Sequence, residues 1–536
     1  MTLSPTAHID TTCRENLPPE SGWPEFLFEL PHLRYPDRLN CATALLDDVI
    51  AEHGADRPCL HEPEGERWSY GGLLATANRV AHLLVDRLGV VPGNRVLLRG
   101  PNNPWLVACW FAVLKAGAVV VTTMPMLRSR ELRDIREISR ADLVLCDYRF
   151  VDELTGDGLE DLTTVTYGGT GTDDLGAVVA DLSERFADVA TAADDVALLA
   201  FTSGTTGRPK ATMHFHRDVL AIADTFSAHV VKPRPDDVFT GTPPLAFTFG
   251  LGGILVFPLR VGASTLLIEK ASPAELARHI AEHHVTVCFT APTAYRAMIA
   301  QCDAGLLSSL RRAVSAGEHL SEATWHAFHE ATGVRLIDGI GSTEMLHVFI
   351  SAADDDIRPG ATGRVVPAFQ ARIVDEAGEP VPDGTPGRLA VKGPTGCRYL
   401  ADDRQKAYVE NGWNITGDTF RRDADGYFWY LARNDDMIVS SGYNIAGPEV
   451  EEAVQTHPDV LECAVVSTPD EARGSVVTAF VCLRDGAVAG DALAADIQRH
   501  VKATIAPYKY PRLVHFVDAL PRTPTGKLQR FRLRSS

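Results

Sequence analysis

Between about residue 40 and residue 430, short apolar runs alternate with longer segments in which apolar residues recur at helical spacing. An unbroken apolar run is typical of a strand that is buried on both faces. Strands are predicted at Val96–Leu98, Ala118–Thr122, Leu143–Cys146, Val196–Phe201 and Val285–Thr290. Helices are predicted at Trp105–Leu114 and Glu131–Ile138, and through Tyr295 and Met298. Strands that alternate with helices predict an α/β fold with parallel sheets covered on both faces.

The pattern changes after Tyr430, where the polar run 433–436 follows the apolar stretch Tyr427–Leu431. The elements predicted beyond it are strand Met437–Ser440, helix Pro448–Thr456, strands Val460–Ser467 and Val476–Leu483, helix Ala492–Ile505 and strand Leu513–Val517. This order predicts a small α+β domain. The expected division is a large N-terminal domain, residues 1–434, and a small C-terminal domain, residues 435–536.

Composition and charge narrow the class of protein. The chain has 536 residues, 45% of them hydrophobic and 23% charged, which excludes disorder along its whole length. Its 70 acidic residues outnumber its 51 basic ones, so the formal net charge at pH 7 is -19. A protein that wraps duplex nucleic acid normally needs a basic surface, so no nucleic-acid partner is expected.

The sequence gives no signal for a membrane or for secretion. The longest apolar stretch, Val107–Val121, is interrupted by Lys115 and Gly117, so a buried helix followed by a buried strand is expected rather than a membrane span. Met1–Glu15 lacks the apolar region of a signal peptide. The ten cysteines are scattered singly, with no CxxC pair and no Cys/His cluster at zinc spacing. We expect a reduced, cytoplasmic protein without a membrane partner, either a monomer or a homodimer.

The nine residues from Thr202 to Lys210, Thr-Ser-Gly-Thr-Thr-Gly-Arg-Pro-Lys, follow the predicted strand Val196–Phe201. Glycines let the backbone turn with positive φ and approach an anion closely, while hydroxyls and exposed N–H groups bond phosphate oxygens. Lys210 adds a positive charge. The spacing differs from that of a Walker A loop. The segment is therefore a candidate phosphate-binding loop, with a solvated surface loop as the alternative.

This segment resembles the phosphate-binding signature of the adenylate-forming superfamily, which includes acyl-CoA synthetases, adenylation domains and luciferases. Four further segments match superfamily motifs in the expected order: 340–344 (Ile-Gly-Ser-Thr-Glu), 416–418 (Thr-Gly-Asp), 433–451 and 524–527 (Pro-Thr-Gly-Lys). The resemblance covers most of the chain. It implies a large N-terminal domain of stacked mixed and parallel sheets with a β-barrel-like subdomain, followed by a small α+β domain on a hinge.

The resemblance also implies a reaction. A carboxylate attacks the α-phosphate of ATP to give an acyl-adenylate and pyrophosphate, and a thiol then displaces AMP. Both reactants of the first step are anions, so positive charge at the reacting oxygens lowers the barrier. By resemblance, the catalytic residues are Lys527, which bridges the carboxylate and the α-phosphate, Thr343, which bonds the α-phosphate, and Glu344, which holds Mg²⁺ on the triphosphate. The alternatives are a solvated lysine at 527 and a helix N-terminal acid at 344.

The remaining nucleotide contacts are implied by the matching positions. Asp418 fits the ribose, because a carboxylate accepts two hydrogen bonds from a diol, and Arg433 fits the ribose or a phosphate. Residues 315–318 and 338–339 resemble the adenine-binding walls, although a plain strand and turn would give the same strings. The residues expected to bind ATP or AMP are Thr202, Ser203, Gly204, Thr205, Thr206, Gly207, Lys210, Ala316, Gly317, Glu318, Asp338, Gly339, Ser342, Asp418 and Arg433.

The C-terminal motifs imply a hinge and a path for CoA. Asp435 falls at the position of the hinge, around which the small domain rotates between the two half-reactions. The residues that resemble the lining of the pantetheine tunnel are Ser441, Gly442 and Tyr443. Two positions depart from the family pattern: Ala432 stands where glycine is usual, and Asn444 stands where a basic residue is usual.

The acid is expected to bind near residues 247–253, Phe-Thr-Phe-Gly-Leu-Gly-Gly. Two aromatic residues and three glycines suit a flat ring in a slot closely lined by backbone. Residues 344–349, Glu-Met-Leu-His-Val-Phe, are similar to the string found in benzoate-type CoA ligases. There His347 would orient a ring substituent or the carboxylate, and a buried structural histidine is the alternative. The expected acid-pocket residues are Ala246, Phe247, Gly250, Gly341, Leu346 and His347.

Over its whole length the sequence most resembles the benzoate-CoA ligase group and, within it, 2-aminobenzoate–CoA ligases. The implied function is ligation of 2-aminobenzoate or a related benzoate to CoA, with ATP, Mg²⁺ and CoA as cofactors and co-substrate. Two other functions stay open. One is transfer of the acid to the phosphopantetheine arm of a carrier protein, and the other is a nucleotide-binding scaffold without catalysis.

Overall fold

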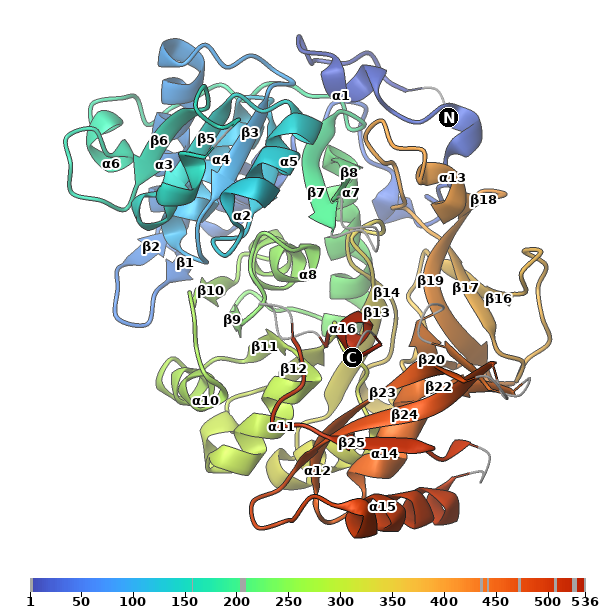
Figure 1. The fold of residues 1–536 in the computed structure, drawn as a ribbon. Helices are drawn as coiled ribbons and strands as arrows, with labels where there is room; N and C mark the ends of the chain where they lie inside the picture. Colours follow the sequence, from blue (N-terminus) through green and yellow to red (C-terminus); the bar gives the residue numbers. More distant parts are fainter. Residues whose placement is uncertain are drawn as a thin grey trace. The chain divides into compact units, whose positions relative to one another are not determined.

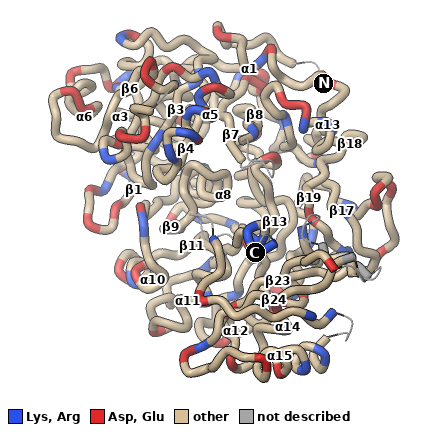
Figure 2. The backbone as a smooth tube through the Cα atoms, in the orientation of Figure 1, with Lys and Arg blue, Asp and Glu red and all other residues tan. Residues whose placement is uncertain are grey.

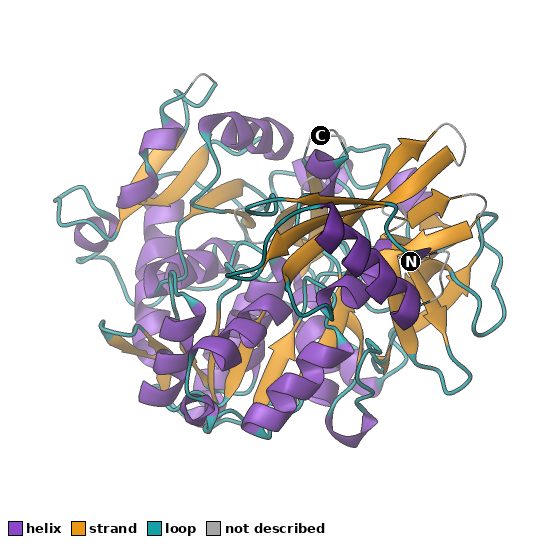
Figure 3. Cartoon of the chain, turned by 60° about the horizontal axis from the view of Figure 1, so that its bottom comes forward, coloured by secondary structure: helices purple, strands orange, loops and turns teal. Residues whose placement is uncertain are grey.

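The computed structural model describes residues 3–156, 158–202, 209–433, 437–440, 443–470, 474–505, 509–522 and 528–534. The chain forms two compact units. The first comprises Met1–Ala316, Glu322–Ala371 and Val391–Asn414, and the second comprises Gly317–Ser321, Arg372–Ala390 and Ile415–Ser536. Figures 1 and 3 show sheets flanked by helices, and each unit is described by itself below.

A six-stranded sheet in the first unit has the order β6-β5-β3-β4-β7-β8. Its strands are β3 (Arg95–Arg99), β4 (Val119–Thr123), β5 (Leu143–Asp147), β6 (Thr163–Tyr167), β7 (Val196–Thr202) and β8 (Lys210–Phe215). All neighbouring strands are parallel except β7 and β8. Every residue of β3 and β5 is buried, as expected for a parallel sheet covered on both faces.

The apolar stretch 107–121 forms a buried helix followed by a buried strand, as predicted. Helix α4 (Pro104–Lys115) begins at Asn103, whose side chain accepts a hydrogen bond from the Leu106 N–H, and Pro104 fits the first turn because it needs no hydrogen-bond acceptor there. Gly117 then adopts a φ of 69°, which favours glycine, and the chain enters β4. Among the described residues no helix has the length and hydropathy to cross a membrane.

A nine-stranded sheet, also in the first unit, has the order β15-β14-β13-β12-β11-β9-β10-β1-β2. Its strands are β1 (Pro58–His61), β2 (Arg67–Ser69), β9 (Val238–Gly241), β10 (Ser264–Leu266), β11 (Val287–Thr290), β12 (Arg312–Ser315), β13 (Leu336–Gly341), β14 (Val348–Ser351) and β15 (Arg364–Val365). From β1 through β10, β9, β11 and β12 to β13 the strands are parallel, and β2, β14 and β15 pair antiparallel at the edges.

Helices connect the strands of both sheets. Besides α4, the α-helices described in the first unit are α1 (Thr12–Glu15), α2 (Asp48–His53), α3 (Tyr70–His82), α5 (Ser129–Ser139), α6 (Leu175–Val178), α7 (His216–Ile222), α8 (Thr248–Leu251), α9 (Phe257–Arg260), α10 (Pro273–Glu282), α11 (Pro292–Gln301), α12 (Glu322–Thr332) and α13 (Gln405–Tyr408). A π-helical segment, Ala223–Val231, continues α7, and another, Gly252–Val256, joins α8 to α9.

A third sheet contains β16 (Gln370–Val374), β17 (Gly387–Lys392), β18 (Val409–Glu410), β19 (Trp413–Arg422) and β20 (Phe428–Arg433). Its order is β16-β17-β19-β18, with β20 paired to β19. This half-barrel sheet is the predicted β-barrel-like subdomain.

The C-terminal part is the predicted α+β arrangement. Strands β21 (Met437–Ser440) and β22 (Tyr443–Ala446) form a two-stranded sheet, and β23 (Val460–Asp470), β24 (Gly474–Leu483) and β25 (Leu513–Phe516) form a three-stranded one. The helices are α14 (Gly447–Gln455), α15 (Asp491–Thr504) and α16 (Arg530–Leu533). Apolar residues of α14, α15, β23 and β24 share one buried core. Lys, Arg, Asp and Glu are interspersed along the described backbone of each unit (Figure 2).

Candidate active site

The predicted phosphate-binding segment connects the antiparallel strands β7 and β8. Thr202, the last residue of β7, pairs with Lys210, the first residue of β8. Arg404 donates a hydrogen bond to the Pro209 carbonyl at 3.2 Å, which ties this end of the segment to the turn around Asp402. The segment's other predicted phosphate-binding residues, Ser203, Gly204, Thr205, Thr206 and Gly207, lie outside the described residues.

Lys210 and the proposed magnesium ligand Glu344 meet at a tyrosine hydroxyl. The Lys210 ammonium donates to Tyr399 Oη at 2.7 Å, and Tyr399 Oη donates to Glu344 Oε1 at 2.5 Å. Lys210 Nζ also lies 3.6 Å from Glu344 Oε1 and 4.6 Å from the centre of the Tyr399 ring. A hydroxyl that accepts from the ammonium and donates to the carboxylate holds both charged groups in fixed positions.

Tyr399 is the member of this group that the sequence motifs missed. It is 1% exposed, and burial, followed by the charge of Glu344, raises its pKa far above the usual range. The hydroxyl therefore stays protonated and keeps donating to Glu344. Nothing in the residues around position 399 marks it as functional, because its partners are 55 and 189 positions away in the chain.

Glu344 lies in a tight turn, residues 342–347, between β13 and β14. Within the turn the Met345 N–H donates to the Ser342 carbonyl and the Leu346 N–H donates to the Thr343 carbonyl, both at 3.2 Å. Leu346 adopts a φ of 66°, a left-handed conformation that costs a branched residue about 1–2 kcal/mol. Strain of this kind persists only where the surrounding structure determines it. The alternative interpretation of Glu344 as an N-terminal helix acid is wrong, because no helix begins there.

A group of buried charged and aromatic side chains contacts this turn through His214. His214 Nε2 lies 2.8 Å from the Thr343 carbonyl. Burial, reinforced by the charge of Arg398, lowers the pKa of His214 to about 3, so the ring is neutral and Nε2 carries the donated proton. Arg398 forms an ion pair with Asp218, and its guanidinium lies 3.8 Å from the centre of the Phe215 ring. All four side chains are buried, and His214 joins this group to the turn.

Three phenylalanine rings surround His347. The centroid of its ring lies 4.6 Å from that of Phe257, 5.3 Å from that of Phe226 and 5.6 Å from that of Phe249. His347 is 3% exposed, and within the described part of the chain neither ring nitrogen has a hydrogen bond of normal geometry. Burial lowers its pKa to about 3, with a weak opposing effect of the Phe249 carbonyl, so the ring is neutral.

Several predicted acid-pocket residues lie in or beside this aromatic cluster. His347 ends the Glu344 turn, and Gly341 precedes the turn, where a Cβ atom would lie 2.5 Å from the His347 carbonyl oxygen. A Cβ atom at Gly250 would lie 2.2 Å from the Pro244 carbonyl oxygen, so only glycine fits there. A further glycine, Gly252, faces His347 directly: its Cβ would lie 2.3 Å from the ring.

The structure brings Phe249 rather than Phe247 against His347. Phe247 is half-buried and its N–H donates to the Pro244 carbonyl at 2.9 Å. The carbonyl of its neighbour Ala246 accepts a hydrogen bond from the Thr122 hydroxyl at 3.1 Å. Nothing in the local sequence marks Phe226 and Phe257, because both lie in apolar helical segments whose pattern resembles that of any core helix.

The second unit holds another group of predicted nucleotide ligands. Asp418 and Arg433 are cross-strand partners on β19 and β20, and Arg433 Nε lies 3.3 Å from Asp418 Oδ1. The Asp418 side chain is 12% exposed and that of Arg433 is 56% exposed, so a carboxylate and a guanidinium are presented together. Gly417 adopts a φ of 79° before Asp418. Elsewhere in this unit, Gly317 has a φ of 89° and Glu318 lies 4.0 Å from Arg522.

The remaining predicted residues are placed as follows. Ala316 follows β12, and Asp338 and Gly339 lie in the neighbouring strand β13. The Ser342 hydroxyl lies 3.1 Å from the Tyr408 hydroxyl. Tyr443 begins β22, and only its backbone is described. The residues predicted for catalysis, hinge and CoA tunnel that lie outside the described residues are Lys527, Asp435, Ser441 and Gly442.

Comparison with known proteins identifies the family. Residues 46–399 match the family model described as AMP-binding enzyme, and residues 449–527 match the model of the AMP-binding enzyme C-terminal domain. The chain is 34% identical to benzoate–CoA ligase of Thauera aromatica, over 94% of this chain and 98% of the relative. It is also 34% identical to 3-hydroxybenzoate–CoA ligase of Aromatoleum sp. (strain CIB), over 92% of this chain and 96% of the relative.

Among solved structures, the anthranilate CoA ligase AuaEII in complex with anthranoyl-AMP superposes with a TM-score of 0.89. It shares 33% sequence identity over 94% of this chain and 98% of the other. The chain therefore belongs to the AMP-binding enzyme family. The resemblance to adenylate-forming enzymes, the fold class and the prediction of an AMP-forming acyl-CoA ligase are confirmed.

Proposed function

We propose that this enzyme ligates 2-aminobenzoate, or a closely related benzoate, to CoA in two steps. In the first step a carboxylate oxygen attacks the α-phosphorus of ATP, and pyrophosphate leaves with the electrons of the broken P–O bond. In the second step the CoA thiolate attacks the carbonyl carbon of the aryl-adenylate, and AMP leaves. The products are the aryl-CoA thioester, AMP and pyrophosphate.

The described residues support a distinct part for each group in the first step. Lys210 supplies positive charge beside the phosphate-binding segment, and Glu344 offers a carboxylate oxygen to Mg²⁺. A single carboxylate suits this metal, and Mg²⁺ bound there would neutralise negative charge on the triphosphate. Tyr399 orients Glu344, and the strained turn fixes its backbone. Asp418 with Arg433 offers acceptors and a donor for a ribose.

The observation that carries the choice of an aromatic acid is the aromatic cluster at the end of this turn. Glu344 and His347 are three residues apart, so the proposed metal ligand and a neutral imidazole surrounded by three phenylalanines belong to one rigid turn. Flat aromatic groups suit a benzoate ring. The relatives named benzoate–CoA and anthranilate CoA ligases support the same class of substrate.

We also propose that residues 1–434 and 435–536 act as two domains, that Asp435 is the hinge, and that Lys527 catalyses the first step only. Ser441, Gly442 and Tyr443 would guide the pantetheine arm in the second step. These assignments rest on the motif matches, and the Lys527 variant described in the Discussion tests them.

The deciding experiment measures AMP release from ATP with benzoate, 2-aminobenzoate, hydroxybenzoates, cinnamates and short fatty acids, each with and without CoA. We expect 2-aminobenzoate to give the largest kcat/KM and a thioester that is detectable by mass spectrometry. A preference for fatty acids would refute the aromatic assignment. Adenylate formation without consumption by free CoA would favour a carrier protein as the acceptor, and ATP binding without AMP release for any acid would favour a non-catalytic scaffold.

A substitution tests the part assigned to His347. His347→Ala should change the order in which ring-substituted benzoates are used, because it replaces the imidazole inside the aromatic cluster. His326→Ala is the matched control, since His326 is a half-exposed histidine on α12 that pairs with Glu322. An unchanged order in both variants would place His347 outside the acid site.

A further inference from the structure

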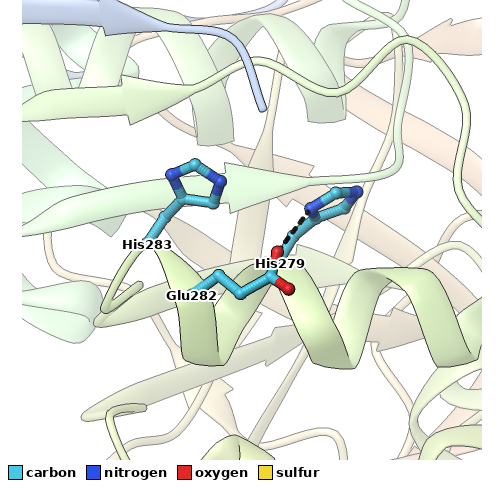
Figure 4. A group of neighbouring side chains, drawn as sticks. All are labelled: His279, Glu282 and His283. Atoms are coloured by element: carbon cyan, nitrogen blue, oxygen red, sulfur yellow. Dashed lines mark ion pairs between the residues drawn. The ribbon is translucent and has the colours of Figure 1, made fainter. Parts of the chain in front are cut away.

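Helix α10 carries a group of metal-ligating side chains that the proposed reaction does not use. Glu282, the last residue of the helix, and His283, its C-cap, come three and four residues after His279, a spacing that brings each of them near His279. One donor atom from each side chain lies within 4.8 Å of the donor atoms of the other two. Figure 4 shows the two imidazoles and the carboxylate side by side, with His279 Nδ1 3.7 Å from Glu282 Oε2.

We propose that His279, Glu282 and His283 bind one divalent transition-metal ion of the zinc type. Two imidazoles and one carboxylate suit zinc, copper and nickel, whereas magnesium and calcium prefer ligand sets made of oxygen atoms. The three protein ligands leave a fourth position for water. Donors around a tetrahedral zinc ion are roughly 3.4 Å apart at the usual bond lengths, so the three side chains, whose donor atoms lie within 4.8 Å of one another, need only small rotations to converge.

The position of the group on the helix favours a cation. The last carbonyls of α10 carry the negative end of the helix dipole, and Glu282 adds a full negative charge. The other end of the helix is fixed by Ser272 and Glu275, whose side chains bond each other's backbone N–H groups, so the ligand face is already formed. The charge of Arg67 on the neighbouring strand β2 opposes a cation here.

A buried imidazole nitrogen that makes no hydrogen bond also supports the assignment. Within the described part of the chain, His279 Nδ1 is buried and makes no hydrogen bond, and the same holds for Nε2 of His61 at the end of β1. His61 lies close enough to His283 for their charges to interact. A buried nitrogen that makes no hydrogen bond lowers the stability of the folded chain, and coordination to a metal would give it a bonding partner. The string His-x-x-Glu-His differs from the Cys/His spacings that are typical of zinc motifs, so the sequence did not indicate this site.

Zinc titration of the full-length, tag-free chain, freed of metal by a chelator and without ATP, tests the proposal. We expect one equivalent of zinc to bind to the wild type and to be lost in the double variant His279→Asn/His283→Asn. Glu282→Gln should weaken binding at least about tenfold, the order of loss expected when a metal site is disturbed. Cobalt should give a visible absorption band in the wild type and no band in the double variant, which reports ligation directly.

The double variant His326→Asn/Glu322→Gln on α12 is the matched control, because it removes an exposed histidine–carboxylate pair that belongs to no group of three metal-ligating side chains within the described residues. It should bind zinc as the wild type does. Because the helical spacing exists only in the folded chain, zinc should also raise the unfolding temperature of the wild type and of this control more than that of the α10 variant. Equal zinc stoichiometry in wild type and α10 variant, or binding only at millimolar zinc, would overturn the proposal.

Discussion

Replacing Tyr399 by phenylalanine isolates the hydroxyl that joins Lys210 to Glu344. The variant keeps the buried ring and removes the hydrogen bonds of 2.7 Å and 2.5 Å to these two residues. A hydrogen bond to a charged group contributes about 1.5–3 kcal/mol. Without it the Glu344 carboxylate is free to move toward Lys210, which lies 3.6 Å away.

If the carboxylate must be held in place to act on the triphosphate, a loss of about 2 kcal/mol slows adenylate formation about 30-fold. The assay is pyrophosphate exchange into ATP with 2-aminobenzoate over a range of magnesium concentrations. Thioester formation from supplied aryl-adenylate is measured in parallel and should change less than about twofold, because that step needs no triphosphate.

Tyr295→Phe is the matched control, since Tyr295 is equally buried and, among the described residues, its hydroxyl bonds the carbonyls of Cys288 and Val314 rather than a charged group. This control should lower the free energy of unfolding, and any change in rate should be the same for both half-reactions. The reasoning is refuted if Tyr399→Phe slows both half-reactions equally, or if it leaves pyrophosphate exchange at the rate of the wild type.

Three further outcomes are expected. Gly252→Ala should lower the free energy of unfolding, measured by chemical denaturation, by about 1–3 kcal/mol, because the new Cβ would lie 2.3 Å from the His347 ring. The control Gly22→Ala, whose Cβ would have nothing within 4 Å, should be nearly neutral. Alanine usually stabilises a helix relative to glycine, so a stabilised Gly252→Ala variant would contradict the packing described. Burial lowers the pKa of His216 from 6.5 to about 3. Between these two pH values the unfolded chain binds a proton at His216 that the native chain does not bind. The stability contributed by the neutral ring is therefore complete above pH 6.5 and declines as the pH falls toward 3. At pH 5 the decline is about 2 kcal/mol, and His216→Asn should flatten the pH dependence of the unfolding midpoint; an unchanged slope would show that this ring is protonated in the native state. Lys527→Ala should suppress pyrophosphate exchange and largely spare thioester formation from supplied adenylate, and equal loss of both would argue against rotation of the C-terminal domain between the steps.

Local patterns predicted most elements because each depends on neighbours in the sequence. The stretch 107–121 was predicted to be a buried helix and strand, and α4 and β4 lie there. The C-terminal order of strands and helices also agrees within a few residues at each boundary, as in helix Ala492–Ile505 against α15. A strand buried on both faces or a helix with an apolar face shows its surroundings directly in its own composition.

The candidate site was predicted only as far as its motifs are continuous in the chain. Glu344 and His347 could be singled out because they belong to one short string, and Asp418 because it ends the Thr-Gly-Asp motif. Tyr399, Phe226 and Phe257 carry no local mark, since a tyrosine before a turn and a phenylalanine in an apolar helix are ordinary in any core.

The sequence by itself determined the order of strands and helices, the acidic net charge and the candidate groups for binding phosphate and the acid. Only the tertiary structure decided which of these groups touch. A tyrosine hydroxyl lies between Lys210 and Glu344, and three phenylalanine rings surround His347. The neutral ring of His214 bonds the Thr343 carbonyl in the turn. The reason is physical. Local propensity acts over a few residues, whereas hydrogen bonds and burial depend on distances that are fixed only when segments far apart in the sequence pack together. Glu344 and Tyr399 are 55 positions apart, and Lys210 and Tyr399 are 189 positions apart.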